Sequence, residues 1–514
     1  MLKILKTGAR FVVLSFAGQS AYQNQQVIQY YVNHQLLAET DKVIVYLDGL
    51  KPETSYQLEA VCEQKVLAAV GFQTQYESIT LDVKDFMARG DGGTNDTGFI
   101  QAAILACPPK GRVLISKGIY KISPLFLKSD INLEIEAGAV LMADNDWRNF
   151  PVLPGYTESY DEKDFYNLCN WEGNPLNCYA SLITGLNVQN VTIYGQGEIN
   201  GNASINDWWD PGIKYREPFR PRMIFLNECR NIDIMGVSIY NSPSWTIHPY
   251  RSHKIDIMGI TIVNPHDSPN TDGIDPESCK DMNIFGVFFD LGDDCIAIKS
   301  SKIFMANKKY MPTSDIRIEH CYMKNGHGAV TIGSEIAAGC HHIYVRHCIF
   351  ENTDRGLRIK TRRGRGSKSI IDQIYFEDIL MIGVKTAFVA NCFYFCDPDG
   401  KSDYVQNQDA MPKDERTPGI HYLEFKNITC RDTRVCAAYL HGLPENPIQQ
   451  VMFDNVLIEM SASGQPDYPA MMLNIEKMKQ NHAVFKNIDV LTLKNFQVLN
   501  SKNEMRMERI GQVQ

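Results

Sequence analysis

Strand-like segments in which apolar and polar residues alternate recur along most of the chain. Asn231–Ile239 is echoed 23 residues later by Lys254–Ile262, and Met282–Phe288 continues the series. Asp315–Cys321 recurs 27 residues later as His342–Cys348. Periods of roughly 20–30 residues that carry β-branched, alternating strands are typical of a β solenoid, in which each coil buries its inward side chains on the next. The pattern predicts an all-β chain that is mostly a parallel solenoid.

The first 80 residues follow a different pattern. Turn residues separate short β-rich runs at the spacing of a small sandwich, and Leu47–Tyr56 resembles the turn and following strand of fibronectin type III modules. We therefore predict two domains, a fibronectin type III-like β-sandwich at residues 1–80 and the solenoid at residues 81–514. No aromatic platform is evident in the runs, which favours a spacer or packing role over carbohydrate binding. The runs are Arg10–Phe16, Gln26–Val32, Lys42–Tyr46, Ser55–Cys62 and Val66–Thr74.

One segment near the start of the solenoid has helical spacing instead. Thr97–Ala106 places Ile100, Ala103 and Ile104 on one face,. The open end of a solenoid exposes strand edges unless something covers them. We expect this helix to cap the first coil.

The overall charge limits the partners that the chain attracts. The sequence has 514 residues, a formal net charge of −9 and a hydrophobic fraction of 44%. A negative chain does not attract polyanions by bulk charge, so no nucleic-acid partner is expected, and a polyanionic ligand requires a local basic patch. Since no apolar run reaches the roughly 18 residues of a membrane span, no membrane partner is expected either. The oligomeric state is not set by these patterns.

Cysteine usage bears on the compartment. The 14 cysteines are scattered without a short-spaced framework, which is typical of a reducing environment and predicts a cytoplasmic location. A secreted or periplasmic location stays open, because Lys3, Lys6 and Arg10 precede the apolar run Phe11–Ala17 and faintly resemble a signal peptide,. The same stretch also reads as a first β-strand.

Four short polar motifs interrupt the repeats between residues 264 and 365. Asp272 and Asp293 are 21 residues apart, about one coil, so they are expected on neighbouring coils roughly 4.8 Å apart,. Gly292 lets the chain bend so that Asp294 can serve the same site. Carboxylates this close push at least one pKa upward, and glycoside hydrolysis needs such a raised acid beside an ionised base. The motifs are Asn270-Thr271-Asp272, Gly292-Asp293-Asp294, Gly326-His327-Gly328 and Arg358-Ile359-Lys360.

The last motif supplies positive charge. Strand alternation puts Arg358 and Lys360 on one face, where they can grip a carboxylate. Arg362, Arg363 and Arg365 extend the run to five basic residues in eight positions. These three either enlarge the basic patch or form a solvated loop.

The four motifs in this order resemble the polygalacturonases and related pectinases of glycoside hydrolase family 28, and Gly326–Ser334 is similar to that family's signature. The resemblance covers about residues 80–490. It implies a right-handed parallel β-helix that hydrolyses α-1,4 bonds of galacturonan with inversion, without a metal or other cofactor. The expected partner is a pectic polysaccharide or an oligogalacturonide.

The resemblance also assigns roles to single residues. It implies that Asp293 is the general acid, that Asp272 and Asp294 hold the attacking water, and that His327 tunes the protonation of the acid. The residues themselves do not separate Asp293 from Asp294 as proton donor. Substrate binding is implied for Asn270, Arg358, Lys360 and Tyr394, although the surroundings of Tyr394 depart from the family pattern.

Three insertions bear on the mode of attack: Ala143–Ala180, Asn206–Arg222 and Lys302–Thr313. Loops that project from one side would close one end of the groove. Together with the N-terminal module they are similar to the bacterial exo-acting members of the family. We therefore predict exo attack from the non-reducing end, with release of one or two galacturonates. Loops that fold away would leave an endo-polygalacturonase.

Other function classes make different demands on the residues. A polysaccharide lyase on a solenoid would need a calcium-binding acidic cluster and a basic residue as base, whereas here the acids are grouped with His327. A non-catalytic adhesin would not need the three aspartates. A hydrolase of the same family that acts on rhamnogalacturonan or xylogalacturonan stays open, although Arg358 and Lys360 together favour a galacturonate beside the scissile bond.

Overall fold

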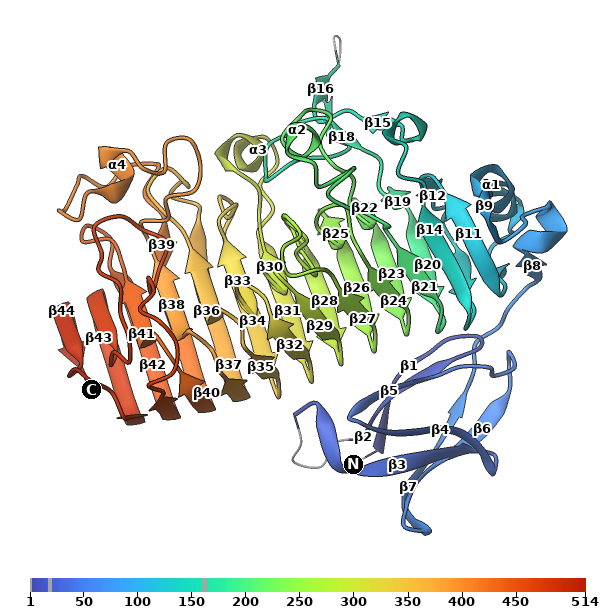
Figure 1. Ribbon diagram of the computed structural model, residues 1–514, viewed down its shortest axis with the longest axis horizontal. Helices are drawn as coiled ribbons and strands as arrows, with labels where there is room; N and C mark the ends of the chain where they lie inside the picture. The colour runs from blue at the N-terminus through green and yellow to red at the C-terminus, as the bar shows by residue number, and fades with distance from the viewer. Residues whose placement is uncertain (1, 17–20, 160–163) are drawn as a thin grey trace.

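The computed structural model describes residues 2–16, 21–159 and 164–514. Most of the chain forms one long array of parallel strands, with the C-terminus at the far end from the N-terminal module (Figure 1). Successive coils pair in register, so that Ile257 lies between Ile234 and Ile284. This is the predicted parallel β-helix, and the repeated segments of the sequence are its strands. Five of them are β23 (Arg230–Met235), β26 (His253–Met258), β28 (Lys280–Phe285), β31 (Thr313–Glu319) and β34 (Cys340–Arg346).

The core of the β-helix is a stack of aliphatic and aromatic ladders. Ile234, Ile257 and Ile284 are fully buried, each on the equivalent side chain of the next coil. The same contiguous cluster runs from Val83 to Leu491. Because the polar positions alternate with these, the outward side chains are free to build a site on the surface.

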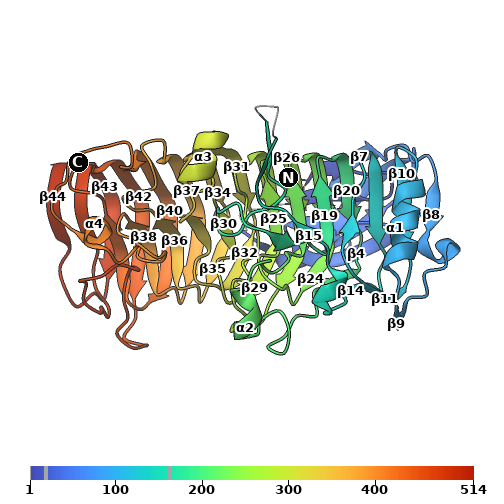
Figure 2. The same cartoon turned by 90° about the horizontal axis from the view of Figure 1, so that it is seen from above.

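A helix covers the N-terminal end of the array, as predicted. Helix α1 occupies Thr97–Ala106 and buries Ile100, Ala103 and Ile104. Figures 1 and 2 both place it beside the first strands of the β-helix. The apolar face of α1 thereby continues the core beyond the first coil.

The N-terminal module is a small β-sandwich of two antiparallel sheets. Residues from both sheets share one buried core that includes Val12, Tyr30 and Leu58. The fibronectin type III likeness and the boundary at residue 80 stay predictions. One sheet has the order β1 (Leu2–Thr7), β2 (Val12–Phe16), β5 (Ile44–Leu47), and the other β4 (Gln35–Lys42), β3 (Gln23–Val32), β6 (Ser55–Cys62), β7 (Lys65–Gln73).

The stretch with a signal-peptide-like pattern falls largely within this sandwich. Strands β1 and β2 belong to it, and Val12 and Leu14 are fully buried. Met1 and residues 17–18 of that stretch lie outside the described residues. No helix in the described part of the chain combines the length and the apolar character needed to cross a bilayer.

The sandwich packs against the side of the β-helix. Phe11 and Val13 share an apolar cluster with Tyr194 and Met235 of the coils. Lys6 Nζ lies 2.7 Å from Asp233 and 2.8 Å from Asp256, two aspartates stacked on neighbouring coils. In Figure 1 the module lies on one side of the β-helix and the insertion loops rise from the other.

The three predicted insertions build those loops. In the first, β15 (Val152–Leu153) pairs with β18 (Cys178–Tyr179) and β16 (Thr157–Glu158) with β17 (Phe165–Tyr166); residues 160–163 lie outside the described residues. The second contains helix α2 (Pro211–Lys214), and α3 (Ile303–Lys308) lies in the third.

Candidate active site

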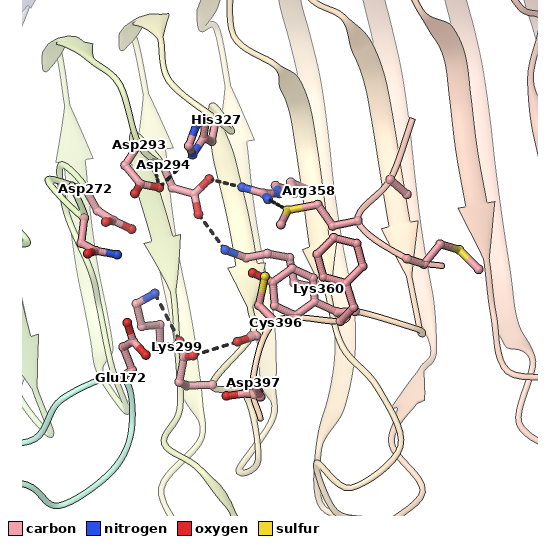
Figure 3. Close-up of a pocket in the computed structure, with 18 of the residues that line it drawn as sticks. Glu172, Asp272, Asp293, Asp294, Lys299, His327, Arg358, Lys360, Cys396 and Asp397 are labelled. Carbon is pink, nitrogen blue, oxygen red and sulfur yellow. Dashed lines mark hydrogen bonds and ion pairs between the residues drawn. The ribbon is translucent and has the colours of Figure 1, made fainter. Parts of the chain in front are cut away.

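A cavity of about 960 Å³ lies beneath these loops. It sits above three parallel strands: β30 (Ile296–Ile298), β33 (Val330–Gly333) and β36 (Arg355–Lys360). Figure 3 shows the side chains that point into it. The structure brings together all eight residues that the sequence predicts for the site. They are Asn270, Asp272, Asp293, Asp294, His327, Arg358, Lys360 and Tyr394.

Strand register explains why these residues converge. Arg358 pairs with Thr331 and Lys360 with Gly333 of the preceding coil. The N–H of Gly273 donates to the carbonyl oxygen of Asp294 at 3.0 Å, which joins the coil of Asp272 to that of Asp293. A Cβ at Gly292 would lie 1.9 Å from the carbonyl oxygen of His266, so only glycine fits where the chain bends,.

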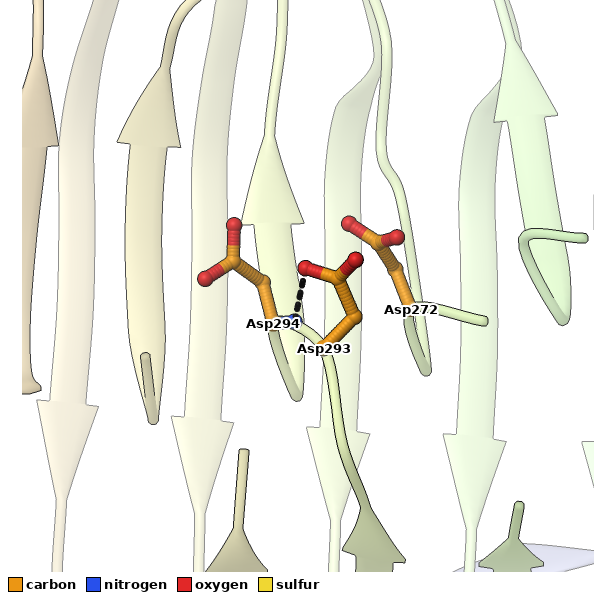
Figure 4. Close-up of side chains that lie close together, drawn as sticks. All are labelled: Asp272, Asp293 and Asp294. Carbon is orange, nitrogen blue, oxygen red and sulfur yellow. Dashed lines mark hydrogen bonds between the residues drawn. The ribbon is translucent and has the colours of Figure 1, made fainter. Parts of the chain in front are cut away.

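The three aspartates form one compact cluster (Figure 4). Each offers a carboxylate oxygen within 4.8 Å of the others. Arg358 Nη1 donates to Asp294 Oδ1 at 2.9 Å and Lys360 Nζ to Oδ2 at 2.8 Å. His327 Nδ1 lies 3.3 Å from Asp293 Oδ1. Asp294 therefore has two cations and Asp293 has the imidazole, while no cation of the described residues lies within ion-pair distance of the Asp272 carboxylate.

These partners give the three aspartates different pKa values. Burial alone would raise the pKa of Asp294, but Lys360 and Arg358 outweigh it and hold that pKa well below its usual range. Burial, followed by the charge of Asp293, raises the pKa of Asp272 well above its usual range. For Asp293, burial is outweighed by the hydrogen bond from His327, which lowers the pKa. Asp272 is thus the most readily protonated of the three acids, and Asp294 is the most readily ionised.

The difference in pKa bears on whether Asp293 or Asp294 is the proton donor, a choice that the sequence leaves open. Asp294 is held ionised by two cations, so it is a poor proton donor. Asp293 faces the cavity beside an imidazole whose own pKa is raised by the bond to Asp293. The spacing of the acids does not itself indicate inversion, because their nearest oxygens are closer than the roughly 6.5–9.5 Å typical of inverting glycosidases,.

Arg358 and Lys360 keep hydrogen-bond donors that their bonds to Asp294 do not use. Arg358 uses one Nη1 bond for Asp294 and contacts the Sδ of Met471 with Nη2. Lys360 Nζ lies 5.7 Å from the ring centroid of Tyr394, which also lines the cavity. Asn270 accepts a 2.7 Å hydrogen bond from Arg220, which fixes its amide at the edge of the cavity.

The other three arginines correct the prediction of an extended basic patch. Arg362, Arg363 and Arg365 are buried and do not line the cavity, so they form neither a binding patch nor a solvated loop. Each holds an acid from a later loop. The pairs are Arg362 with Asp399 at 2.7 Å, Arg363 with Glu445 at 2.6 Å and Arg365 with Asp397 at 2.6 Å.

Sequence reasoning missed a second group of charges in the cavity. Lys299 lies 3.4 Å from both Asp275 and Glu335, and its ammonium sits 4.5 Å from the ring centroid of Trp245. Lys299 directly follows the apolar strand β30, and Glu335 lies two residues after the end of β33 on the next coil. Polar residues at the ends of buried strands were the signal that could have found them.

All three insertions contribute to the wall of the cavity. The first provides Trp171 and Glu172, the second Tyr215 and Phe219, and the third Lys302. Trp171 stacks on Phe219 with ring centroids 4.9 Å apart. A C-terminal loop that carries Tyr468 and Met471 completes the lining, and no pattern in the sequence indicated it.

A sugar-sized cavity on a parallel β-helix, with carboxyl groups whose pKa values are shifted in opposite directions, defines a class, the β-helical enzymes that cleave glycosidic bonds,. Residues 169–477 match the family model "Glycosyl hydrolases family 28". The chain belongs to this family and is a glycoside hydrolase.

Individual relatives agree with this assignment. The chain is 31% identical over 395 residues to "Probable polygalacturonase" of Vitis vinifera, covering 74% of each chain. It is 30% identical over 311 residues to "Endo-polygalacturonase" of Pectobacterium carotovorum subsp. carotovorum, covering 58% of this chain and 72% of that protein. Among solved structures, the family 28 exopolygalacturonase of Yersinia enterocolitica shares the fold, with a TM-score of 0.72 at 20% identity over 100% of this chain and 98% of that one.

Proposed function

We propose that the chain hydrolyses α-1,4-galacturonosidic bonds of polygalacturonate and oligogalacturonides, with inversion and from the non-reducing end. The observation that carries the proposal is the pairing of Asp294 with Arg358 and Lys360 beside Asp293 and His327. It places an ionised carboxylate, a titratable acid and two cations around one cavity. The similarity to polygalacturonases of Vitis and Pectobacterium supports galacturonan as the substrate.

The three aspartates have different roles in the proposed reaction. Asp293 donates a proton to the leaving glycosidic oxygen, and its bond to His327 sets when that proton is present,. Asp294, held ionised, accepts a hydrogen bond from the attacking water, and Asp272 holds the same water from the neighbouring coil. Protonation of the leaving group and attack of water together avoid a free alkoxide leaving group, which is the costly species in uncatalysed cleavage.

The cations provide recognition. Arg358 and Lys360 carry more N–H donors than their bonds to Asp294 consume, so both can also donate to a galacturonate carboxylate,. A neutral sugar at that position would leave buried charged donors without a partner, which lowers its affinity. The bond that is cleaved therefore lies next to a galacturonate.

The mode of attack is supported by the lining of the cavity. Trp171, Phe219 and Lys302, one from each insertion, stand around it and narrow an otherwise open groove. A closed end admits a chain terminus and excludes the middle of a long chain. This geometry favours exo attack over the endo mode.

Polygalacturonate of high molecular mass tests the proposal. Solution viscosity is followed against the percentage of bonds cleaved, with products resolved by size and the anomer of the first product by NMR. We expect a slow fall in viscosity, mono- or digalacturonate as the product and inversion at the anomeric carbon. A steep early fall with mixed oligomers would show endo attack, and products that absorb as unsaturated uronates would show a lyase.

A further inference from the structure

Two cysteines of the first insertion lie against each other beside the cavity wall. Cys178 of β18 pairs with Leu153 of β15, and Cys169 Sγ lies 3.0 Å from the carbonyl oxygen of the same Leu153. Both sulfurs also contact one carbonyl oxygen, that of Leu176, at 3.3 Å from Cys169 and 3.6 Å from Cys178. The Cys169 thiol in turn hydrogen-bonds the Cys178 sulfur. The two side chains thus meet at the base of the loop that they enclose.

A buried cation stands beside the second sulfur. Arg222 is buried, and its Nη1 donates to Cys178 Sγ at 3.3 Å. Its Nη2 donates to the carbonyl oxygen of Asn170, which lies 3.3 Å from the same sulfur. Among the described residues no carboxylate lies within ion-pair distance of this guanidinium, and its Nε has no hydrogen-bond partner. Because an uncompensated buried charge is costly, the position of Arg222 favours a thiolate at Cys178.

These contacts make the two thiols unlike each other. Burial on its own raises the pKa of Cys178, but the hydrogen bond from Cys169 and the charge of Arg222 outweigh burial and lower that pKa. The charge of Glu217 acts on Cys178 in the opposite direction. The bond to Cys178, followed by burial, raises the pKa of Cys169. One thiolate in contact with one thiol is the arrangement that thiol–disulfide exchange requires.

A second pair of neighbouring cysteines lacks such a cation. Cys321 and Cys348 follow β31 and β34 at equivalent positions of successive coils, and their side chains hydrogen-bond each other. Burial, followed by the bond to Cys321, raises the pKa of Cys348 well above its usual range. The hydrogen bonds of both sulfurs to other described residues go to backbone carbonyl oxygens. This pair is the internal reference for contact between thiols without a guanidinium.

We propose that Cys169 and Cys178 form a redox site, at which a small disulfide oxidant joins the two sulfurs and so fixes one wall of the cavity. The ring closed by the new bond runs from residue 169 to residue 178. In the dithiol form, hydrogen bonds that can open hold this segment, among them those between β15 and β18. Formation of the disulfide does not depend on the proposed hydrolysis, so either can fail without the other. Four residues of the ring line the cavity: Trp171, Glu172, Asn174 and Leu176.

The reaction is an exchange with a disulfide such as oxidised glutathione. The Cys178 thiolate attacks one sulfur of the oxidant, which leaves a mixed disulfide on Cys178 and releases one glutathione thiolate. The released thiolate takes the proton of Cys169, and Cys169 then attacks Cys178 Sγ and displaces the second glutathione. The two protein sulfurs are oxidised by two electrons, and the oxidant is reduced to two thiols, one of which takes its proton from water.

Opening of the insertion gives the oxidant access, since both sulfurs are buried. Strands β15 and β18 have two residues each, and the apolar cluster around the cysteines is separate from the core of the β-helix. Figure 1 shows β15, β16 and β18 outside the stacked coils. A segment with so few ladder bonds opens locally while the coils stay folded.

Mass spectrometry of the full-length protein tests the proposal. The native protein is equilibrated with reduced or oxidised glutathione, then denatured and alkylated. We expect all 14 cysteines to be alkylated after the reduced treatment and two fewer after the oxidised one. A glutamyl endopeptidase cuts after Glu172, between Cys169 and Cys178, so their two peptides should stay linked until a reductant is added. Full alkylation after oxidation, or a linked pair elsewhere, would overturn the proposal.

Variants separate the effect of the cation from mere proximity of the thiols. The rate of disulfide formation should rise with pH to a midpoint below about 8.5, the ordinary thiol pKa. Arg222→Gln should slow it at least tenfold at pH 7, whereas Arg222→Lys keeps the charge and should stay within threefold. Cys348→Ala, in the reference pair, should change neither the rate nor the linked peptides. An equal rate in Arg222→Gln, or loss of the link in Cys348→Ala, would contradict the mechanism. Circular dichroism verifies each fold, and the pH profile of the unmodified protein decides if Arg222→Gln does not fold.

Proteolysis of the native protein tests the effect on the cavity wall. Cleavage after Glu172 by the same protease requires the insertion to open. We expect the disulfide form to be cleaved there at least tenfold more slowly than the dithiol form. Cleavage after Glu158, an exposed residue of the same insertion outside the ring, should differ by less than threefold between the two forms. Equal rates of cleavage after Glu172 would show that the bond does not fix the wall.

Discussion

At the scale of single residues, three aspartates of identical chemistry differ because their neighbours differ. Asp294 is nearly fully buried, yet it stays ionised because Arg358 and Lys360 each donate to one of its oxygens. Asp272 has no such ion pair among the described residues, and burial together with the charge of Asp293 raises its pKa. One residue type therefore supplies carboxyl groups of different proton affinity, and such differences are what let carboxyl groups take separate acid and base roles in glycosidases.

Replacing Asp293 by asparagine tests the assignment of the proton donor. An amide occupies nearly the same volume but cannot donate the proton to the leaving oxygen. We expect Asp293→Asn to lower kcat by about 10²–10⁴-fold. Steady-state rates on oligogalacturonides measure the loss, and circular dichroism verifies that the β-helix is intact. A variant that keeps more than roughly a tenth of the activity would show that another residue is the donor.

The pair of His327 and Asp293 predicts the pH profile. Its bond to Asp293 raises the pKa of His327 above 6.5, so the interaction is complete below pH 6.5 and is lost as the pH rises through the raised value. On the acid side, the lowered pKa of Asp293 means that the interaction is lost only as the pH falls through that lowered value. We expect the alkaline limb of kcat/KM to have its midpoint above pH 6.5.

His327→Gln supplies the comparison for this profile. Glutamine retains a hydrogen-bond donor but does not titrate, so the alkaline limb should disappear or move. The measurement is kcat/KM from pH 3 to 9 for both proteins at constant ionic strength. An alkaline limb with the same midpoint in both would assign it to a different group.

At the scale of elements, the coils depend on ladders of identical inward positions. Ile284 is fully buried between Ile257 and Ile318 of the adjacent coils. Ile284→Ala removes contacts with both coils and leaves a cavity, which should cost about 2–5 kcal/mol of unfolding free energy. Urea unfolding measures it. Lys280→Ala, at an exposed position of the same strand, should change the unfolding free energy by less than about 0.5 kcal/mol,. Comparable losses in the two variants would mean that the isoleucine ladder is not what stabilises the coils.

The coils and their acids are also what the sequence predicts well. Ile-x-Ile alternation at repeated spacing fixes which side chains point inward, and a spacing of 21 residues places Asp272 beside Asp293. Both signals are periodic, so short-range patterns carry them.

The loops that line the cavity have no periodic sequence pattern from which their position could be predicted. Glu172 and Met471 reach the cavity from segments that share no period with the coils. Their placement depends on tertiary contacts such as the approach of Gly173 to Glu335. Arg362, Arg363 and Arg365 mislead for the same reason, since their acidic partners lie more than 30 residues away in sequence.

At the scale of the whole molecule, the two domains share an interface that lies away from the cavity. None of the described residues before Trp171 lines the cavity, so the sandwich does not touch substrate there. It instead covers Tyr194, Met235 and Met258 on the flank of the β-helix. This arrangement favours the packing role that the sequence predicts for the module.

Lys6 is the residue through which this role can be tested. Its ammonium bridges Asp233 and Asp256 at the interface, and the three side chains are partly buried there. Lys6→Glu would put a third carboxylate between the two aspartates and so oppose docking of the sandwich. We expect a loss of about 1–3 kcal/mol of unfolding free energy and faster proteolysis of the linker at residues 74–79. Since the cavity is remote, kcat/KM should stay within twofold. Lys3→Glu, an exposed position of the same strand, is the control and should alter neither property. If Lys6→Glu instead lowered kcat/KM tenfold while unfolding stayed unchanged, the sandwich would have a part in catalysis and not only in packing.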